Sequence, residues 1–96
     1  MDTPEDLVDQ VCDEGSFLVF LEALAKDFRR EREIESANPS PAFSRGALGW
    51  ENRNIDDVLD AAAAYASATC DRWTNDGPVS IWKRCAQILM AGKFYE

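Results

Sequence analysis

The fold class is decided by the stretch SFLVFLEALAKDF, residues 16–28. Its apolar side chains recur at the i, i+4, i+7 and i+11 spacing that places residues on one face of an α-helix. These side chains are Phe17, Leu21, Leu24 and Phe28. Because Ser16 is a preferred N-cap residue, we predict a helix from there to about residue 34. The charged segment at 29–33 is expected to project into solvent.

The segments on either side of this helix have their own start and stop signals. Thr3 precedes a proline and two acidic residues, which is typical of a helix N-terminus and predicts a helix over about 4–13 that Gly15 ends. After the central helix, Pro39 and Pro41 remove backbone donors and favour extended backbone. We therefore expect a long loop over about 36–49.

Two more helices are predicted in the C-terminal half. Asn54 is a typical N-cap, and the helical apolar pattern that follows it continues to Trp73. Ser80 is a typical N-cap for a last helix, which ends at Gly92. No segment has the alternating pattern of a β-strand. The predicted fold is therefore all-α, a compact four-helix single domain over residues 1–96 with the long loop between helices 2 and 3.

The small residues Ala61–Ala64 should let a neighbouring helix approach closely. Phenylalanines of the 16–34 helix are the expected fillers, namely Phe17, Phe20 and Phe28. The expected core residues are Leu24, Leu59, Trp73 and Leu89. The three cysteines, Cys12, Cys70 and Cys85, have no metal-ligand spacing and are expected to be reduced, buried thiols.

The composition excludes several functional classes. Ten Lys and Arg against 18 Asp and Glu give a net charge of −8, which repels nucleic acid and anionic membranes. Histidine is absent, so the commonest general base and metal ligand are missing. We expect no cofactor, no metal site and no catalytic residue. The acidic N-terminus is unlike a signal peptide, which together with the absence of a long apolar run indicates a cytoplasmic protein.

Only carboxylates could support an enzymatic reading. Asp56, Asp57 and Asp60 lie at the start of a predicted helix, where acidic residues are expected without any function because they compensate the helix dipole. A hydrolase would need one buried acid with a raised pKa, and nothing in this spacing indicates one. A carboxylate-based hydrolase is the weakest of the functions considered.

The distribution of acidic residues is more informative than their number. Residues 1–27 contain eight acidic residues and one lysine, and residues 55–80 contain five acidic residues and one arginine. If the helices over 4–13 and 55–73 lie side by side, their polar faces form one negative surface that can steer a basic partner. The alternative is that the charge only keeps a small domain in solution.

The segment Trp50-Glu51-Asn52 precedes the third helix. Trp50 has two readings: it packs structurally against that helix near Val58, or it is an aromatic anchor at a binding surface. In the second reading, the partner-binding residues are Trp50, Glu51, Asp56, Asp57 and Asp60.

Motifs spread over most of the chain resemble a family of small, acidic, uncharacterised bacterial proteins. They are Ser16-Phe17-Leu18-x-Phe20 with Ala23-Leu24 and Asp27, Trp50-Glu51-Asn52, Leu59-Asp60-Ala61, Trp82-x-x-x-Ala86-x-Ile88-Leu89 and Phe94-Tyr95-Glu96. The chain departs from the family pattern at Val58, where the family has Phe, and in its longer loop. The resemblance implies a helical module in the bacterial cytosol and carries no known activity.

These observations favour a protein–protein binding module without enzymatic activity. Our first expectation is an immunity-type inhibitor that presents an acidic surface to a basic protein partner such as a toxin. The alternative is an adaptor or secretion-chaperone-like protein that binds through an apolar groove, which would require exposed hydrophobic surface.

Overall fold

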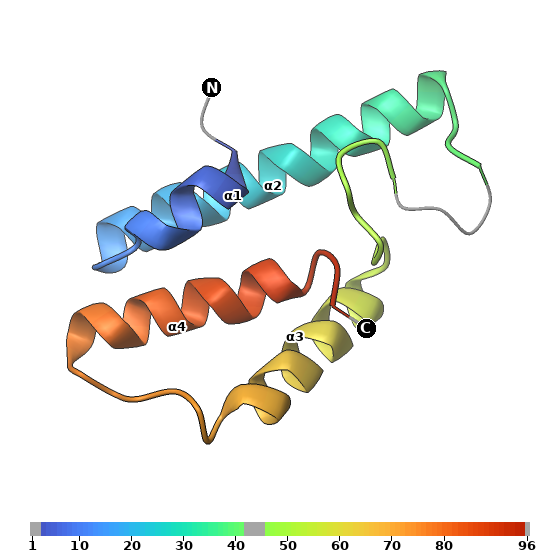
Figure 1. Cartoon of the computed structure of the whole chain (residues 1–96). Helices are drawn as coiled ribbons and strands as arrows, with labels where there is room; N and C mark the ends of the chain where they lie inside the picture. The colour runs from blue at the N-terminus through green and yellow to red at the C-terminus, as the bar shows by residue number, and fades with distance from the viewer. Residues whose placement is uncertain (1–2, 42–45, 96) are drawn as a thin grey trace.

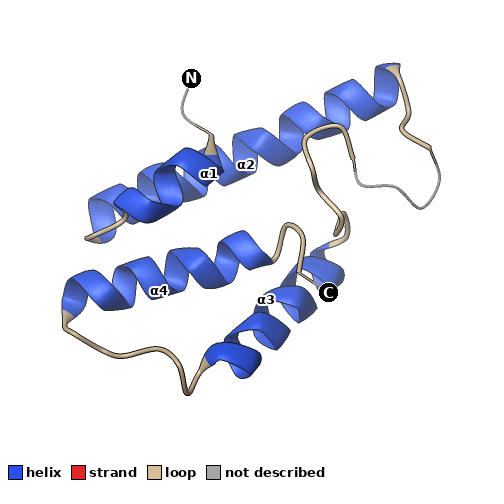
Figure 2. Cartoon of the chain, viewed as in Figure 1, coloured by secondary structure: helices blue, strands red, loops and turns tan. Residues whose placement is uncertain are grey.

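The computed structural model describes residues 3–41 and 46–95, and within them it contains helices and no strand (Figures 1 and 2). The elements are α1 Pro4–Leu7, the 3-10 helix η1 Val8–Gln10, α2 Glu14–Ala37, α3 Ile55–Thr69 and α4 Pro78–Ala91. This confirms the all-α fold with four α-helices. The predicted loop lies between α2 and α3, and its residues 42–45 fall outside the described part of the chain.

The helices form a thin, flat body. Residues of α4 pack against α2, α3 and η1, while α1 packs against α2 (Figure 1). The dimensions are 44 × 28 × 17 Å, and the shortest is less than two helix diameters of about 10–12 Å each. Each helix therefore keeps a side toward solvent, which limits how many apolar residues can be buried.

Two predicted helix boundaries in the N-terminal part are wrong. The first helix ends at Leu7 and continues only as the short η1. Gly15 does not end it, because Gly15 lies inside α2. The N-cap of α2 is Asp13, whose carboxylate accepts a hydrogen bond from the backbone N–H of Ser16 at 2.8 Å. Ser16 is its capping-box partner, since its hydroxyl accepts from the backbone N–H of Asp13 at 3.1 Å.

The later boundaries also differ from the prediction. Helix α3 ends at Thr69, so Trp73 lies beyond it. Helix α4 begins at Pro78, and its N-cap is Gly77 with a φ of 114°, a conformation that favours glycine. Proline suits the first helical position because its missing N–H would be unbonded there. Ser80 closes the preceding turn instead, and its hydroxyl accepts from the backbone N–H of Asp76.

The buried core lies where α2, α4 and the N-terminal segment meet. Its buried members are Val11, Phe20, Ala86 and Met90, and the partly buried Leu24 and Leu89 pack against them, in line with their prediction as core residues. The prediction is wrong for Leu59, which is 58% exposed, and for Trp73, which is 36% exposed. The cause is that α3 contacts α4, through its small residues, and leaves its larger apolar side chains uncovered.

Close approach of α3 and α4 depends on small residues on both helices. Ala61 and Ala62 are buried, and a Cβ on Gly92 would come within 2.8 Å of a methyl group of Val58. The predicted phenylalanine fillers pack elsewhere: Phe17 lies 5.3 Å from Trp82 and Phe28 lies 4.8 Å from Trp50, measured between ring centroids.

The cysteine prediction is half wrong. All three thiols are free, but Cys12, Cys70 and Cys85 are exposed. Cys12 lies in the turn before α2 and Cys70 directly follows α3, so neither belongs to the apolar face of a helix. Among the described residues, no helix combines the length and apolar character required to cross a membrane.

Candidate functional site

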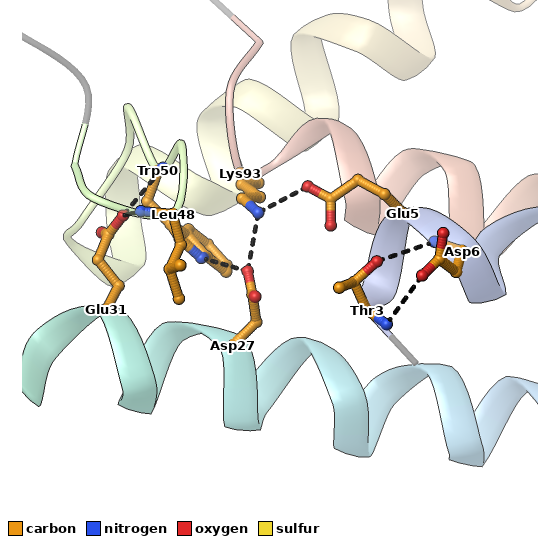
Figure 3. Close-up of polar contacts among 8 residues, drawn as sticks. All are labelled: Thr3, Glu5, Asp6, Asp27, Glu31, Leu48, Trp50 and Lys93. Atoms are coloured by element: carbon orange, nitrogen blue, oxygen red, sulfur yellow. Dashed lines mark hydrogen bonds and ion pairs between the residues drawn. The ribbon is translucent and has the colours of Figure 1, made fainter. Parts of the chain in front are cut away.

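A buried lysine at the end of α4 connects three parts of the chain. Lys93 has a side chain only 2% exposed, and its Nζ donates to Oδ2 of Asp27 at 2.8 Å and to Oε2 of Glu5 at 2.7 Å (Figure 3). Burial disfavours the charged amine, but the hydrogen bonds that it donates to Asp27 and Glu5 outweigh this effect and raise the pKa of Lys93 above its usual value. The ammonium therefore ties α1, α2 and the C-terminal segment together.

The same carboxylate of Asp27 positions Trp50. The indole Nε1 donates to Oδ2 of Asp27 at 2.9 Å, and the ring meets Phe28 edge to face. Trp50 is 4% exposed, so its hydrogen-bonding group is buried and satisfied. Lys93 also lies 5.6 Å from the ring centroid, in cation–π range.

One turn further along α2, a second buried carboxylate shapes the loop that carries Trp50. Glu31 is 1% exposed, and its Oε1 accepts the backbone N–H groups of Leu48 and Trp50, each at 3.1 Å (Figure 3). A Cβ on Gly46 would overlap this carboxylate, so the loop requires glycine there. The expectation that residues 29–33 all project into solvent is therefore wrong for Glu31.

The C-terminal segment completes the cluster. The backbone carbonyl of Lys93 accepts the N–H groups of Glu51 and Asn52 at 2.9 and 3.2 Å. The amide of Asn52 donates to the carbonyls of Gly92 and Tyr95, both at 3.1 Å. The Trp-Glu-Asn segment and the C-terminal aromatic segment, both noted as motifs, are thus held together by hydrogen bonds.

The chemical role of this cluster is positional. Among the described residues, no buried side-chain nitrogen or oxygen lacks a hydrogen-bond partner, so the cluster presents no unpaired group. Sequence reasoning missed Glu5, Glu31 and Lys93 because their partners are distant in sequence. The one available signal was Asp27, a polar residue within an otherwise apolar motif.

Trp50 and Phe28 also line an apolar groove between α2 and α3. The groove has a volume of about 340 Å³. Its walls are Leu21, Leu24, Ala25 and Phe28 from α2, Trp50, Arg53 and Asn54 from the connecting segment, and Ile55, Val58 and Leu59 from α3. Two of these apolar residues are strongly exposed: Ile55 by 81% and Leu59 by 58%. The polar cluster fixes Trp50, which in turn forms part of the groove wall.

The predicted partner-binding residues are distributed unevenly around this groove. Trp50 is buried in its wall, so it is not an exposed anchor. Its ring packs on Phe28 of α2, whereas the structural prediction placed it against the following helix near Val58. Glu51, Asp56, Asp57 and Asp60 are exposed. Asn54 precedes α3 as predicted, but its side-chain amide donates to Asp57 at 3.0 Å rather than capping the helix backbone.

The condition for one merged acidic surface, that the first and third helices lie side by side, is not met. Figure 1 shows α4 between α1 and α3, and α1 packs on α2 instead. The acidic residues of the N-terminal segment and those of α3 therefore lie on separate parts of the surface. Within residues 3–41 and 46–95, no group of three or more Cys, Asp or Glu side chains is arranged to hold a metal ion.

Comparison with the curated proteins and with the solved structures finds no match. A family model, described as a family of unknown function (DUF7660), matches residues 13–96. The matched region contains α2, α3 and α4, and with them the groove and both buried carboxylates of α2. The resemblance to an uncharacterised family is confirmed, and the chain belongs to the family of unknown function DUF7660.

Proposed function

We propose that this protein is a protein-binding module whose docking surface is the groove between α2 and α3. The observation that carries the proposal is the exposure of Ile55 and Leu59 beside a wall of apolar side chains. Contiguous exposed apolar surface costs free energy in water, and in soluble proteins it commonly marks an interaction site. A partner that covers these side chains recovers that free energy.

The chemistry of the groove supports binding rather than catalysis. Its polar lining consists of Arg53 and Asn54, and no carboxylate lines it. The buried acids Asp27 and Glu31 lie outside it, and each already accepts hydrogen bonds from fixed donors. Neither is placed to exchange a proton with a ligand in the groove, which argues against the hydrolase alternative.

An immunity-type inhibitor of a basic partner is the second candidate. It is supported by three exposed carboxylates, Glu51, Asp56 and Asp60, which directly follow the groove-lining residues Trp50, Ile55 and Leu59 in sequence. Such charges accelerate the encounter with a basic protein, while apolar contacts hold the complex together. The acidic surface and the groove can therefore serve one partner.

Site-specific photo-crosslinking tests the docking surface. We would place p-benzoylphenylalanine at Leu59, at Ile81 or at Asp57, irradiate cells that naturally contain the protein, and identify the adducts. Ile81 is 42% exposed and does not line the groove, which makes it the matched apolar control. We expect one dominant adduct from the Leu59 position. An adduct from Asp57 or Ile81 but not from Leu59 would contradict the proposal.

A further inference from the structure

We infer that the occupant of the groove is an amphipathic α-helix of two to three turns with a basic flank. This inference rests on the proposed docking surface and adds the chemistry of the ligand. Three properties of the groove support it: its length, the nature of its walls and the charge along one edge.

The length of the groove corresponds to a short helix. On α2, the wall runs from Leu21 to Phe28, which at 1.5 Å per residue is about 10 Å. On α3, it runs from Ile55 to Leu59, which is about 6 Å. A helix that covers both walls needs about two turns in contact, with apolar residues at i, i+3 or i+4, and i+7.

The walls favour a helix over an extended peptide. Both walls are α-helices, whose interior backbone groups are already bonded within the helix, and the described residues contain no strand edge. An extended segment pressed into the groove would bury its own N–H and C=O groups without partners, at a cost of about 1–3 kcal/mol for each group. A helical ligand bonds these groups internally and presents only side chains.

Two carboxylates give the groove a charged edge. Asp56 follows Ile55, and Asp60 follows Leu59. Each acid therefore lies about 100° around the helix axis from an exposed apolar residue of the groove. Asp57 adjoins the groove at another point, because it precedes Val58 and accepts a hydrogen bond from the side-chain amide of Asn54, and both of these residues line the groove. The basic residue of the lining, Arg53, forms an ion pair with Glu35 at 3.9 Å. A ligand with Lys or Arg along the α3 side therefore complements the edge.

A second copy of the chain is a poor occupant. Each copy carries a net charge of −8, so self-association would bring like charges together beside the acidic edge. A basic partner gains attraction at the same place. The charge thus discriminates between these two ways to cover the same apolar surface.

Selection from a random peptide library on the whole protein tests the inference. We would select 16-residue peptides by mRNA display at low ionic strength and measure their dissociation constants by fluorescence anisotropy. The groove variant is I55S/L59S, with V79S/I81S as its control because Val79 and Ile81 are exposed apolar residues outside the groove. The edge variant is D56N/D60N, with D71N/D76N as a control that removes the same charge beyond the C-terminal end of α3, at exposed residues that do not line the groove.

We expect selected peptides with a helical apolar repeat, a net positive charge and helical circular dichroism when bound. The groove variant should weaken binding at least about thirtyfold, and the edge variant about tenfold at low salt and less at high salt, because salt screens exposed charges. Both controls should stay within twofold of the wild type.

The outcomes separate the inference from the proposed function. Peptides whose binding depends on Ile55 and Leu59 but which lack a helical apolar repeat would contradict a helical ligand. Peptides that depend on the same residues but carry negative charge would contradict the basic flank. In both cases the groove would remain the docking surface. Failure to select any peptide that depends on the groove would overturn both. A groove-dependent dimer in analytical ultracentrifugation would overturn the partner helix in favour of a second copy.

Discussion

Replacing Lys93 by Met is the sharpest test of the buried cluster that holds Trp50. The substitution nearly preserves side-chain volume but removes the ammonium that bonds Asp27 and Glu5. Asp27 is 12% exposed and would keep only the Trp50 indole as a side-chain donor. An ionised carboxylate left buried with one of its two donors removed is strongly destabilising.

The magnitude follows from the exposure of the two acids. Removing one partner of a buried ion pair costs about 3–5 kcal/mol. Glu5 is 53% exposed, so its ion pair with Lys93 contributes to the free energy of unfolding as a surface pair does, by at most about 1 kcal/mol. Because half of the arrangement is open to water, we expect K93M to lower the free energy of unfolding by about 3 kcal/mol. That is a large fraction of the roughly 5–14 kcal/mol expected for a domain of this size.

Equilibrium unfolding in urea, followed by far-UV circular dichroism at pH 7, measures this loss. E5Q serves as a control and should cost less than about 1 kcal/mol. The double variant D27L/K93M should cost less than the sum of its single changes, since neither charge is then left unpaired. A loss below about 0.5 kcal/mol for K93M, or equal losses for K93M and E5Q, would refute the reasoning.

Three further predictions concern stability. G46A should lower the free energy of unfolding by about 1–3 kcal/mol in urea titration, because its new methyl group meets the buried carboxylate of Glu31. The control is G15A in the first turn of α2, where the new methyl group meets nothing closer than 3.7 Å, so this variant should be neutral or stabilising. Equal effects of the two variants would contradict the role given to Gly46. L59A should lower the free energy of unfolding by less than about 1 kcal/mol, since Leu59 is 58% exposed. A loss above about 2 kcal/mol would show that Leu59 is a core residue and contradict this prediction. The raised pKa of Lys93 means that its stabilising effect is complete below about pH 10.4, the unfolded value, and is lost as the pH rises through the folded value. Urea midpoints should therefore fall more steeply between pH 10 and 12 for the wild type than for K93M, and parallel curves would contradict the assignment.

Helix existence could be predicted from the sequence because each helix carries its own periodic signal. The i, i+4, i+7 spacing from Phe17 to Phe28 marks α2 without reference to any other element. Boundaries were less accurate because competing caps lie close together. Asp13 and Ser16 are both good N-caps, and only the three-dimensional structure shows which one the helix uses.

The burial of single residues could not be predicted from the same signal. An apolar stripe shows which side of a helix faces the protein, but the number of neighbours decides how much of it is covered. Helix α3 packs on α4 through Ala61 and Ala62, and within residues 3–41 and 46–95 no further helix covers Leu59. An expected core residue thereby becomes part of a groove wall.

The polar cluster was hidden from the sequence for a different reason. Lys93 meets Glu5 and Asp27 across 88 and 66 residues, and helix periodicity carries no information about such distant pairs. Glu31 looked like one of several surface charges because its neighbours in the chain are charged. Its burial follows from the course of the loop that carries Trp50.

The most direct test of the proposed docking surface is the affinity of the partner found by crosslinking. Isothermal titration calorimetry would compare wild-type protein, I55S/L59S and V79S/I81S. Burial of each groove side chain contributes roughly 1.5 kcal/mol, so losing both should raise the dissociation constant about a hundredfold. The control V79S/I81S should leave it unchanged. Equal affinities of I55S/L59S and wild-type protein for the partner would contradict the groove as the binding surface.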